Sequence, residues 1–168
     1  MGAELTIKVD DIPQLNEKIK SLGFDLPTGL AFLPRNIISA KAKADLVNAE
    51  TTSTVRVLFK KAGLVETPLA KEEKIPELAL ASFDWVGPTI FLASTLITQN
   101  PQIVDVLISV LSDYLTNFFK GIAKEQRRAE LDIVTQTKSG SYKDIHYDGD
   151  VEGLKELPKI IRSLHDER

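Results

Sequence analysis

The sequence predicts an α+β fold in which a small, mainly antiparallel sheet packs against a buried central helical hairpin and flanking helices. Three observations lead to this prediction. Residues 83–121 are the most apolar stretch of the chain and contain two prolines. Residues 5–9 alternate between apolar and polar side chains, as a half-buried strand does. Residues 130–148 alternate in the same way on both sides of a turn-forming segment, which is typical of a β-hairpin.

The apolar stretch predicts two helices joined by a tight break. Pro88 and Pro101 suit the first turn of a helix, where a missing N–H has no cost. Gly121 suits the position just after a helix C-terminus. We therefore expect helices over residues 88–98 and 101–120. Polar side chains recur every three or four residues along the second helix and leave most of its circumference apolar, so it must be covered on several sides.

The N-terminal part of the chain begins with strand 5–9, which leads into a helix over residues 12–22. A loop follows over 24–36, and it either is irregular throughout or contains a short extended piece. An Ala-rich segment predicts a helix over residues 40–49. Residues 55–64 fit either a strand or a helix. Two lysines just before Gly63 favour the helix, because cations stabilise a helix C-terminus.

The C-terminal part predicts the two strands of the hairpin at residues 130–137 and 142–148. A last helix is expected over residues 151–164, with Asp150 as its N-cap. Pro158 lies inside this helical pattern, where it either kinks the helix or splits it in two.

The length of 168 residues predicts a single domain over residues 1–168. An alternative division has an N-terminal lobe over 1–66, a linker over 67–82 and a C-terminal lobe over 83–168. Two prolines and a charged run within residues 66–81 favour such a linker.

Composition excludes several classes of site. The chain has no cysteine, which rules out disulfides, thiolate zinc sites and cysteine nucleophiles. We expect no cofactor, because no phosphate-binding glycine loop or other catalytic motif occurs. The chain does not open with a basic and then apolar leader, so we expect a cytoplasmic protein. Membrane insertion is disfavoured, because Asp105 and Asp113 would lie at bilayer depth.

One cluster of polar residues has the composition of a metal or acid–base site. Asp144, His146 and Asp148 alternate along the second hairpin strand and so project from one face. Together with Asp132 on the neighbouring strand they offer carboxylate and imidazole ligands to a divalent ion. The alternative is the ordinary solvent-facing side of a sheet whose other side is buried.

Basic residues gather after the second helix of the hairpin, where they offer contacts to phosphate: Lys120, Lys124, Arg127 and Arg128. The alternative is a solvated connector. A net charge of −3 and the absence of interleaved aromatic residues disfavour nucleic-acid binding.

Trp85 precedes the hairpin, where it serves either as a packing anchor or as part of a partner surface. The leading functional hypothesis is a non-catalytic protein-interaction or scaffold subunit, either a homo-oligomer or a component of a larger intracellular complex, because the second hairpin helix is apolar on so many sides. The alternatives are a metal-dependent hydrolase or nuclease that uses Asp144, His146 and Asp148, and an accessory nucleic-acid-binding protein that uses the basic cluster.

Overall fold

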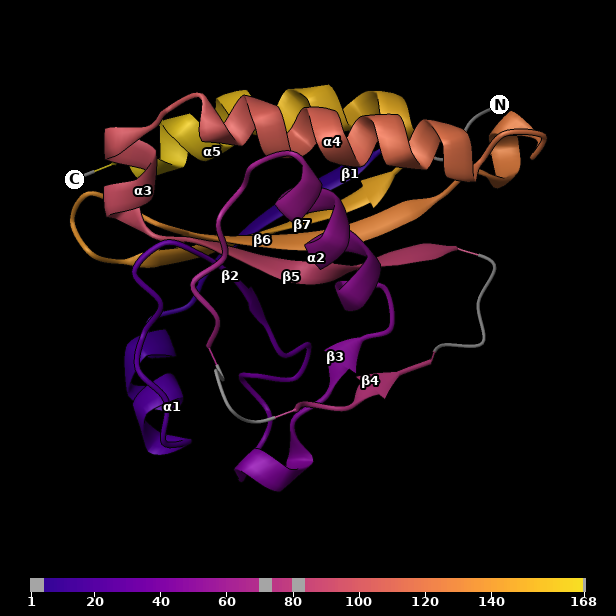
Figure 1. Cartoon of the computed structure of the whole chain (residues 1–168). Helices are drawn as coiled ribbons and strands as arrows, with labels where there is room; N and C mark the ends of the chain where they lie inside the picture. The colour runs from indigo at the N-terminus through magenta and orange to yellow at the C-terminus, as the bar shows by residue number, and fades with distance from the viewer. Residues whose placement is uncertain (1–4, 70–73, 80–83, 168) are drawn as a thin grey trace.

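The computed structural model describes residues 5–69, 74–79 and 84–167, and these residues form the expected α+β fold (Figure 1). The helices are α1 (Leu15–Ser21), α2 (Thr52–Lys61), α3 (Ser94–Gln99), α4 (Ile103–Phe118) and α5 (Leu157–His165). The strands are β1 (Thr6–Asp11), β2 (Leu30–Leu33), β3 (Asn48–Ala49), β4 (Glu77–Leu78), β5 (Trp85–Leu92), β6 (Ala129–Gln136) and β7 (Tyr142–Gly149). Short 3-10 segments are η1 (Lys43–Asp45), η2 (Lys124–Gln126) and η3 (Val151–Glu156).

Five of the described strands form one sheet in the order β1-β7-β6-β5-β2. Neighbouring strands are antiparallel, apart from β5 and β6, which run parallel. Parallel neighbours require a long crossover, which α3 and α4 supply here. Figure 1 shows α3, α4 and α5 above the sheet, with α1 and the small β3–β4 pair on its other side.

The sheet separates two hydrophobic cores. In the larger core, Ile133 and Ile145 of neighbouring strands pack with Leu111 of α4 on the helical side of the sheet. In the smaller core, Leu15 of α1 packs with Phe91 of β5 on the opposite side. Each fully buried large apolar side chain contributes about 1.5–3 kcal/mol, so the two cores together determine which face of each strand points to the helices.

The expected helix over residues 88–98 is wrong, because this segment begins as strand β5 and becomes helical only at Ser94. The Gly87-Pro88 pair lies at an irregularity in the pairing with β6, between Val86 and Thr89. A bulge of this kind tolerates proline in a sheet, because no ladder hydrogen bond is required there. The segment predicted as a helical hairpin therefore consists of strand β5, the short helix α3 and the long helix α4.

Two further expectations in the N-terminal part need correction. Residues 40–49 do not form a helix but contain η1 and β3. Here the side chain of Asn36 donates to the carbonyl of Asp45 at 2.8 Å and accepts from the N–H of Val47 at 2.9 Å, which holds the segment in an irregular path. The expected strand at residues 5–9 exists as β1, but it is an almost fully exposed edge strand and not half-buried. The short extended piece considered for the loop 24–36 is confirmed, because Leu30–Leu33 form the buried strand β2.

The other predicted elements are confirmed within a few residues. They are α1, α2, α4 and the β6–β7 hairpin. The last helix is split, as Pro158 suggested, into η3 and α5, and the Asp150 side chain caps η3 by accepting from the N–H of Gly153 at 3.3 Å. The predicted linker 67–82 lies partly outside the described residues, and β2 pairs with β5 in the same sheet as the C-terminal strands. Among the described helices, none has the length and apolarity needed to cross a bilayer.

Candidate functional site

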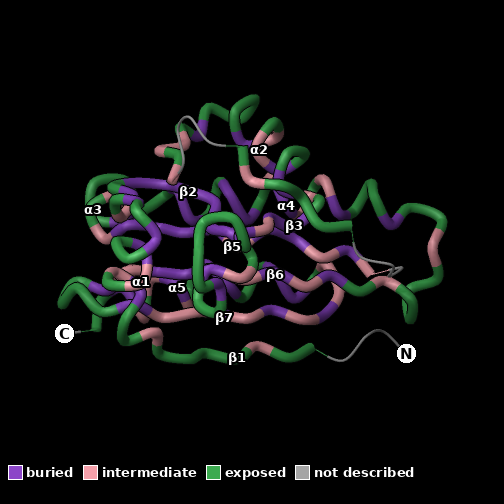
Figure 2. Tube along the Cα trace, turned by 90° about the horizontal axis from the view of Figure 1, so that it is seen from below, coloured by how far each residue is buried: buried purple, intermediate pink, exposed green. Residues whose placement is uncertain are grey.

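The side of the sheet opposite α4 and α5 carries a row of acidic and basic side chains, which we call the polar face. Its members are Lys8 and Asp10 of β1, Asp144, His146 and Asp148 of β7, and Glu130 and Asp132 of β6. They share this face because Ile145 and Tyr147, which alternate with them, point into the larger core. Figure 2, which looks at the sheet from this side, shows half-buried residues alternating with buried ones along β6 and β7.

His146 lies directly opposite Asp132 across the β6–β7 pair. Its Nδ1 atom is 2.9 Å from Oδ1 of Asp132, so the predicted proximity of these two residues is confirmed. Partial burial lowers the pKa of His146, but the hydrogen bond to Asp132 and its charge outweigh this effect, so the net pKa is raised. The pair therefore favours a protonated imidazole.

Asp144 is the most perturbed carboxyl group of the polar face. Burial, followed by the charge of Asp132 and a hydrogen bond with it, raises the pKa of Asp144 to about 7. Its Oδ1 atom is buried and has no hydrogen-bond partner. Near neutral pH this carboxyl group is therefore partly protonated, which suits it to share a proton with Asp132.

Arg128 occupies the other end of the polar face. Its Nε atom donates to Oδ1 of Asp148 at 2.6 Å, and a second guanidinium nitrogen contacts the other oxygen of this carboxylate. The guanidinium also lies 3.9 Å from Glu130 and 4.0 Å from Asp84. The hydrogen bond from Arg128 lowers the pKa of Asp148. Arg128 is therefore the counter-ion of an acidic cluster.

Glu130, His146 and Asp148 each offer one ligand atom, and these three atoms lie within 4.8 Å of one another. This set differs from the predicted one, because Glu130 takes the place of Asp132 and Asp144. Glu130 was missed although it alternates with Asp132 on the predicted strand, and the register places it opposite Asp148. The three groups suit a divalent cation in chemistry, but Arg128 already neutralises Asp148.

The remaining members of the predicted basic cluster have separate roles. Arg127 donates from Nε to the carbonyl of Ile122 at 2.7 Å, which closes the turn after α4. Lys120 and Lys124 are exposed. Trp85 is a packing anchor: it is buried at the start of β5, and its ring lies 6.3 Å from that of Tyr114.

His165, which follows no recognisable motif, is only 3% exposed. Its Nε2 atom lies 3.0 Å from the hydroxyl of Ser94 and 3.3 Å from that of Thr98, so it fastens the end of α5 to α3. Asp166 lies 3.5 Å from Nδ1 of His165 but is held by Lys138 at 3.0 Å. The buried His165 therefore connects α5 to the half-buried Ser94 of α3, while Asp166 stays exposed.

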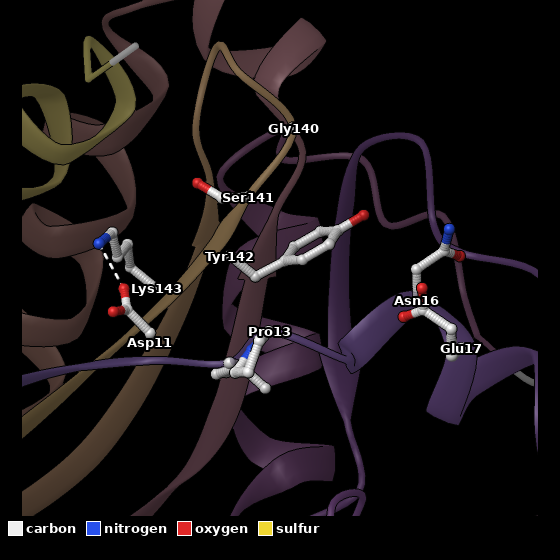
Figure 3. Close-up of a pocket in the computed structure, with 9 residues that line it drawn as sticks. Asp11, Pro13, Asn16, Glu17, Gly140, Ser141, Tyr142 and Lys143 are labelled. Carbon is white, nitrogen blue, oxygen red and sulfur yellow. Dashed lines mark hydrogen bonds and ion pairs between the residues drawn. The ribbon is translucent and has the colours of Figure 1, made fainter.

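A polar groove of about 510 Å³ lies between the start of β7 and α1. Figure 3 shows the Tyr142 ring between the Asp11–Lys143 ion pair on one side and Asn16 and Glu17 on the other. Both charges of the ion pair are satisfied by each other, and burial raises the pKa of Tyr142, so its hydroxyl stays protonated.

The outer flank of α4 carries an apolar stripe, which we call the α4 stripe. It consists of Val106, Val110, Tyr114 and Phe118, spaced four residues apart. Val106 is 39% and Phe118 is 44% exposed, while the other two pack partly against the larger core. An exposed polar line, made of Asp105, Ser109, Asp113 and Asn117, runs beside it.

Comparison of the chain with models of protein families, with curated proteins and with solved structures finds no match.

Proposed function

We propose that this chain is a non-catalytic interaction subunit that binds a protein surface through the α4 stripe. The observation that carries the proposal is the row of apolar side chains on the outside of a helix whose other apolar residues are already buried. A contiguous apolar patch rimmed by polar residues is typical of a protein-interaction site.

The chemistry of the α4 stripe supports this proposal. The rings of Tyr114 and Phe118 have their centroids 6.1 Å apart, and Phe118 meets Phe119 edge-on at 5.0 Å. Aromatic side chains are enriched at the centres of protein interfaces. Anchors four residues apart along a helix suit docking into an apolar groove of a partner.

The experiment compares the wild type with the double variant Val106→Glu/Phe118→Glu. A matched control, Ser109→Glu/Asn117→Glu, adds the same two charges to the polar line of the same helix. All four positions are exposed, so circular dichroism should show an unchanged fold.

We expect the wild type and the control to bind a fluorescent probe of apolar surfaces, such as anilinonaphthalene sulfonate, and to retain protein partners on purification. The stripe variant should lose both properties, because two carboxylates interrupt the apolar patch. Equal behaviour of the two double variants in both assays would contradict the proposal.

A metal-dependent acid–base function is the second candidate, and the clustering of Glu130, His146 and Asp148 favours it. A cation at these three groups would have to displace the guanidinium of Arg128 from Asp148. Titration with Mn²⁺ or Mg²⁺ tests this candidate, because a ligand that binds the native state raises the melting temperature. A shift that is lost in His146→Ala would support it, whereas no shift at saturating metal would contradict it.

A further inference from the structure

Strand β1 lies at the free edge of the sheet. Among the strands that the structure describes, it pairs with β7 alone, in unbroken register from Thr6 opposite Asp148 to Asp11 opposite Lys143. Figure 2 shows it along the outer border of the molecule. An edge strand presents backbone N–H and C=O groups that can pair with another strand.

The backbone of this edge is open to pairing, while its charged residues Lys8, Asp10 and Asp11 restrict which strand can add to it. Neither proline nor glycine occurs within β1, and its pairing with β7 shows no bulge. Leu5 and Val9 point to the helical side of the sheet, yet they are 45% and 41% exposed. A further strand added at this edge would cover these two apolar side chains, which explains why apolar residues occupy exposed positions.

The opposite side of β1 carries an unbalanced charge pattern. Asp10 lies opposite Asp144, which is also close to Asp132, so three carboxyl groups follow one another across β1, β7 and β6. Lys8 lies opposite His146 and makes no ion pair with any residue that the structure describes. The row of three carboxyl groups, Asp132, Asp144 and Asp10, therefore ends at the free edge of the sheet, and no cation of a described residue lies next to Asp10 on the outer side of β1.

We propose that two copies of this chain pair through β1, antiparallel about a two-fold axis at Val9. In this register Lys8 of each copy lies opposite the partner's Asp10, and Val9 meets its symmetry equivalent. Two ion pairs then close the interface, and each carboxyl row gains the cation that it lacks. The same patch serves on both copies, as a two-fold interface requires.

The charges also select this register against its neighbours. A shift that keeps each side chain on its own face of the sheet must move the axis by one residue. With the axis at Lys8, the two lysines would lie opposite each other, and with the axis at Asp10, the two aspartates would do so. Like charges directly opposite across strands are destabilising, so only the axis at Val9 pairs opposite charges.

This inference deepens the proposed function and rests on it, because it assumes that the chain works as a subunit of an assembly. It adds the identity of one partner, a second copy, and it uses β1 and not the α4 stripe. The two surfaces can therefore be tested separately.

The test is a charge swap followed by light scattering. The wild type should have about 37 kDa, which is twice the 18.6 kDa of one chain. Lys8→Glu places like charges opposite Asp10, and Asp10→Lys places like charges opposite Lys8, so each variant alone should have the mass of a monomer. An equimolar mixture of the two variants should return to the dimer mass, because each introduced charge then meets its opposite.

A monomeric wild type, single variants that stay dimeric, or a mixture that stays monomeric would overturn the inference. The stripe variant Val106→Glu/Phe118→Glu separates it from the proposed function, and it should keep the dimer mass. If the stripe variant dissociates the dimer and the charge variants do not, the inference fails while the proposed function stands. If the charge swap behaves as expected but the stripe variant matches its control, the proposed function fails and the β1 dimer stands.

Discussion

The Nδ1 atom of His146 lies 2.9 Å from Oδ1 of Asp132, and this contact joins the two central strands β6 and β7 on the polar face. Asp132 also faces Asp144, so one carboxylate serves both an imidazole and a second carboxyl group. Asp132, Asp144 and His146 of the polar face are thus coupled to one another, so the substitution of one of them should change the pKa of Asp144 or His146.

The first prediction concerns the pKa of His146. Asp132→Asn removes the charge and the accepting carboxylate that raise this pKa, and leaves the burial that lowers it. The charges of Glu130 and Asp144, which also raise it, remain, so we expect the His146 pKa to fall relative to the wild type. A proton NMR titration of the His146 imidazole in the wild type and in the variant measures this. An unchanged His146 pKa in the variant would contradict the assigned contact.

The second prediction concerns the pH dependence of stability. The pKa of Asp144 is raised from 3.8 to about 7, so the folded state holds this proton more tightly than the unfolded state. Its contribution is therefore fully present below about pH 4 and is lost as the pH rises through about 7. The raised pKa of His146 acts in the same direction, whereas the lowered pKa of Asp148 acts in the opposite direction at acidic pH.

Asp144→Asn removes the largest of these contributions. After a discount for partial exposure, we expect the variant to gain about 1–2 kcal/mol over the wild type at pH 8. Below pH 4 this difference should disappear. Urea unfolding across this pH range measures the effect, and Asp113→Asn on the exposed side of α4 is the control. A variant whose stability follows the wild-type pH profile would refute the role given to Asp144.

The third prediction concerns Arg128. Arg128→Gln removes a two-point contact with Asp148, whose carboxylate is 16% exposed, and should cost about 1 kcal/mol at pH 7. Arg162→Gln is a matched control, because it breaks a 2.9 Å pair with Asp105 in which both partners are well exposed. Its cost should be close to zero. If the two variants unfold at the same denaturant concentration, the stabilising role given to the Arg128–Asp148 contact is wrong.

The same substitution separates the two candidate functions. Without the guanidinium, the Glu130, His146 and Asp148 set loses its counter-ion and should bind Mn²⁺ more strongly than in the wild type. A larger metal-induced rise in melting temperature for Arg128→Gln is the expected result. If the wild type shows the larger rise, Arg128 does not compete with the cation and only positions the Asp148 carboxylate.

The fourth prediction concerns Gly87 at the irregularity in β5. A Cβ atom added there would lie 2.5 Å from Cζ3 of Trp85 and 3.1 Å from Cβ of Leu131, so only glycine fits. Gly87→Ala should destabilise the protein by about 1–3 kcal/mol. Trp85→Phe removes the part of the ring in contact, so its cost should be smaller in the Gly87→Ala background than in the wild type. Additive costs in this double-mutant cycle would exclude the contact.

Elements with an unambiguous period could be predicted from the sequence. The β6–β7 hairpin alternates along most of both strands, so both its strands and the shared face of Asp132 and His146 could be predicted. Strand β5 could not, because Gly87-Pro88 has the composition of a helix start while it marks a bulge. Residues 40–49 have helical propensity that the tertiary contacts of Asn36 override.

The candidate site could be predicted only in part, because strand pairing decides it. The sequence places Asp144, His146 and Asp148 on one face, but only the register brings Glu130 opposite Asp148 and Arg128 within reach of both. The exposure of β1 also depends on its place at the sheet edge, which alternation alone does not reveal. His165 owes its burial to the docking of α5 on α3, a contact between segments far apart in the chain.

The central claim is that the α4 stripe is a docking surface. The most direct test is the mass of the complex that is purified with the chain from its native cells, measured by light scattering. The measurement compares the stripe variant Val106→Glu/Phe118→Glu with its control Ser109→Glu/Asn117→Glu. We predict that the complex of the control has a larger mass than the β1 dimer, because a partner protein is bound, and that the stripe variant has the mass of the dimer alone. Equal masses for the two variants would contradict the claim.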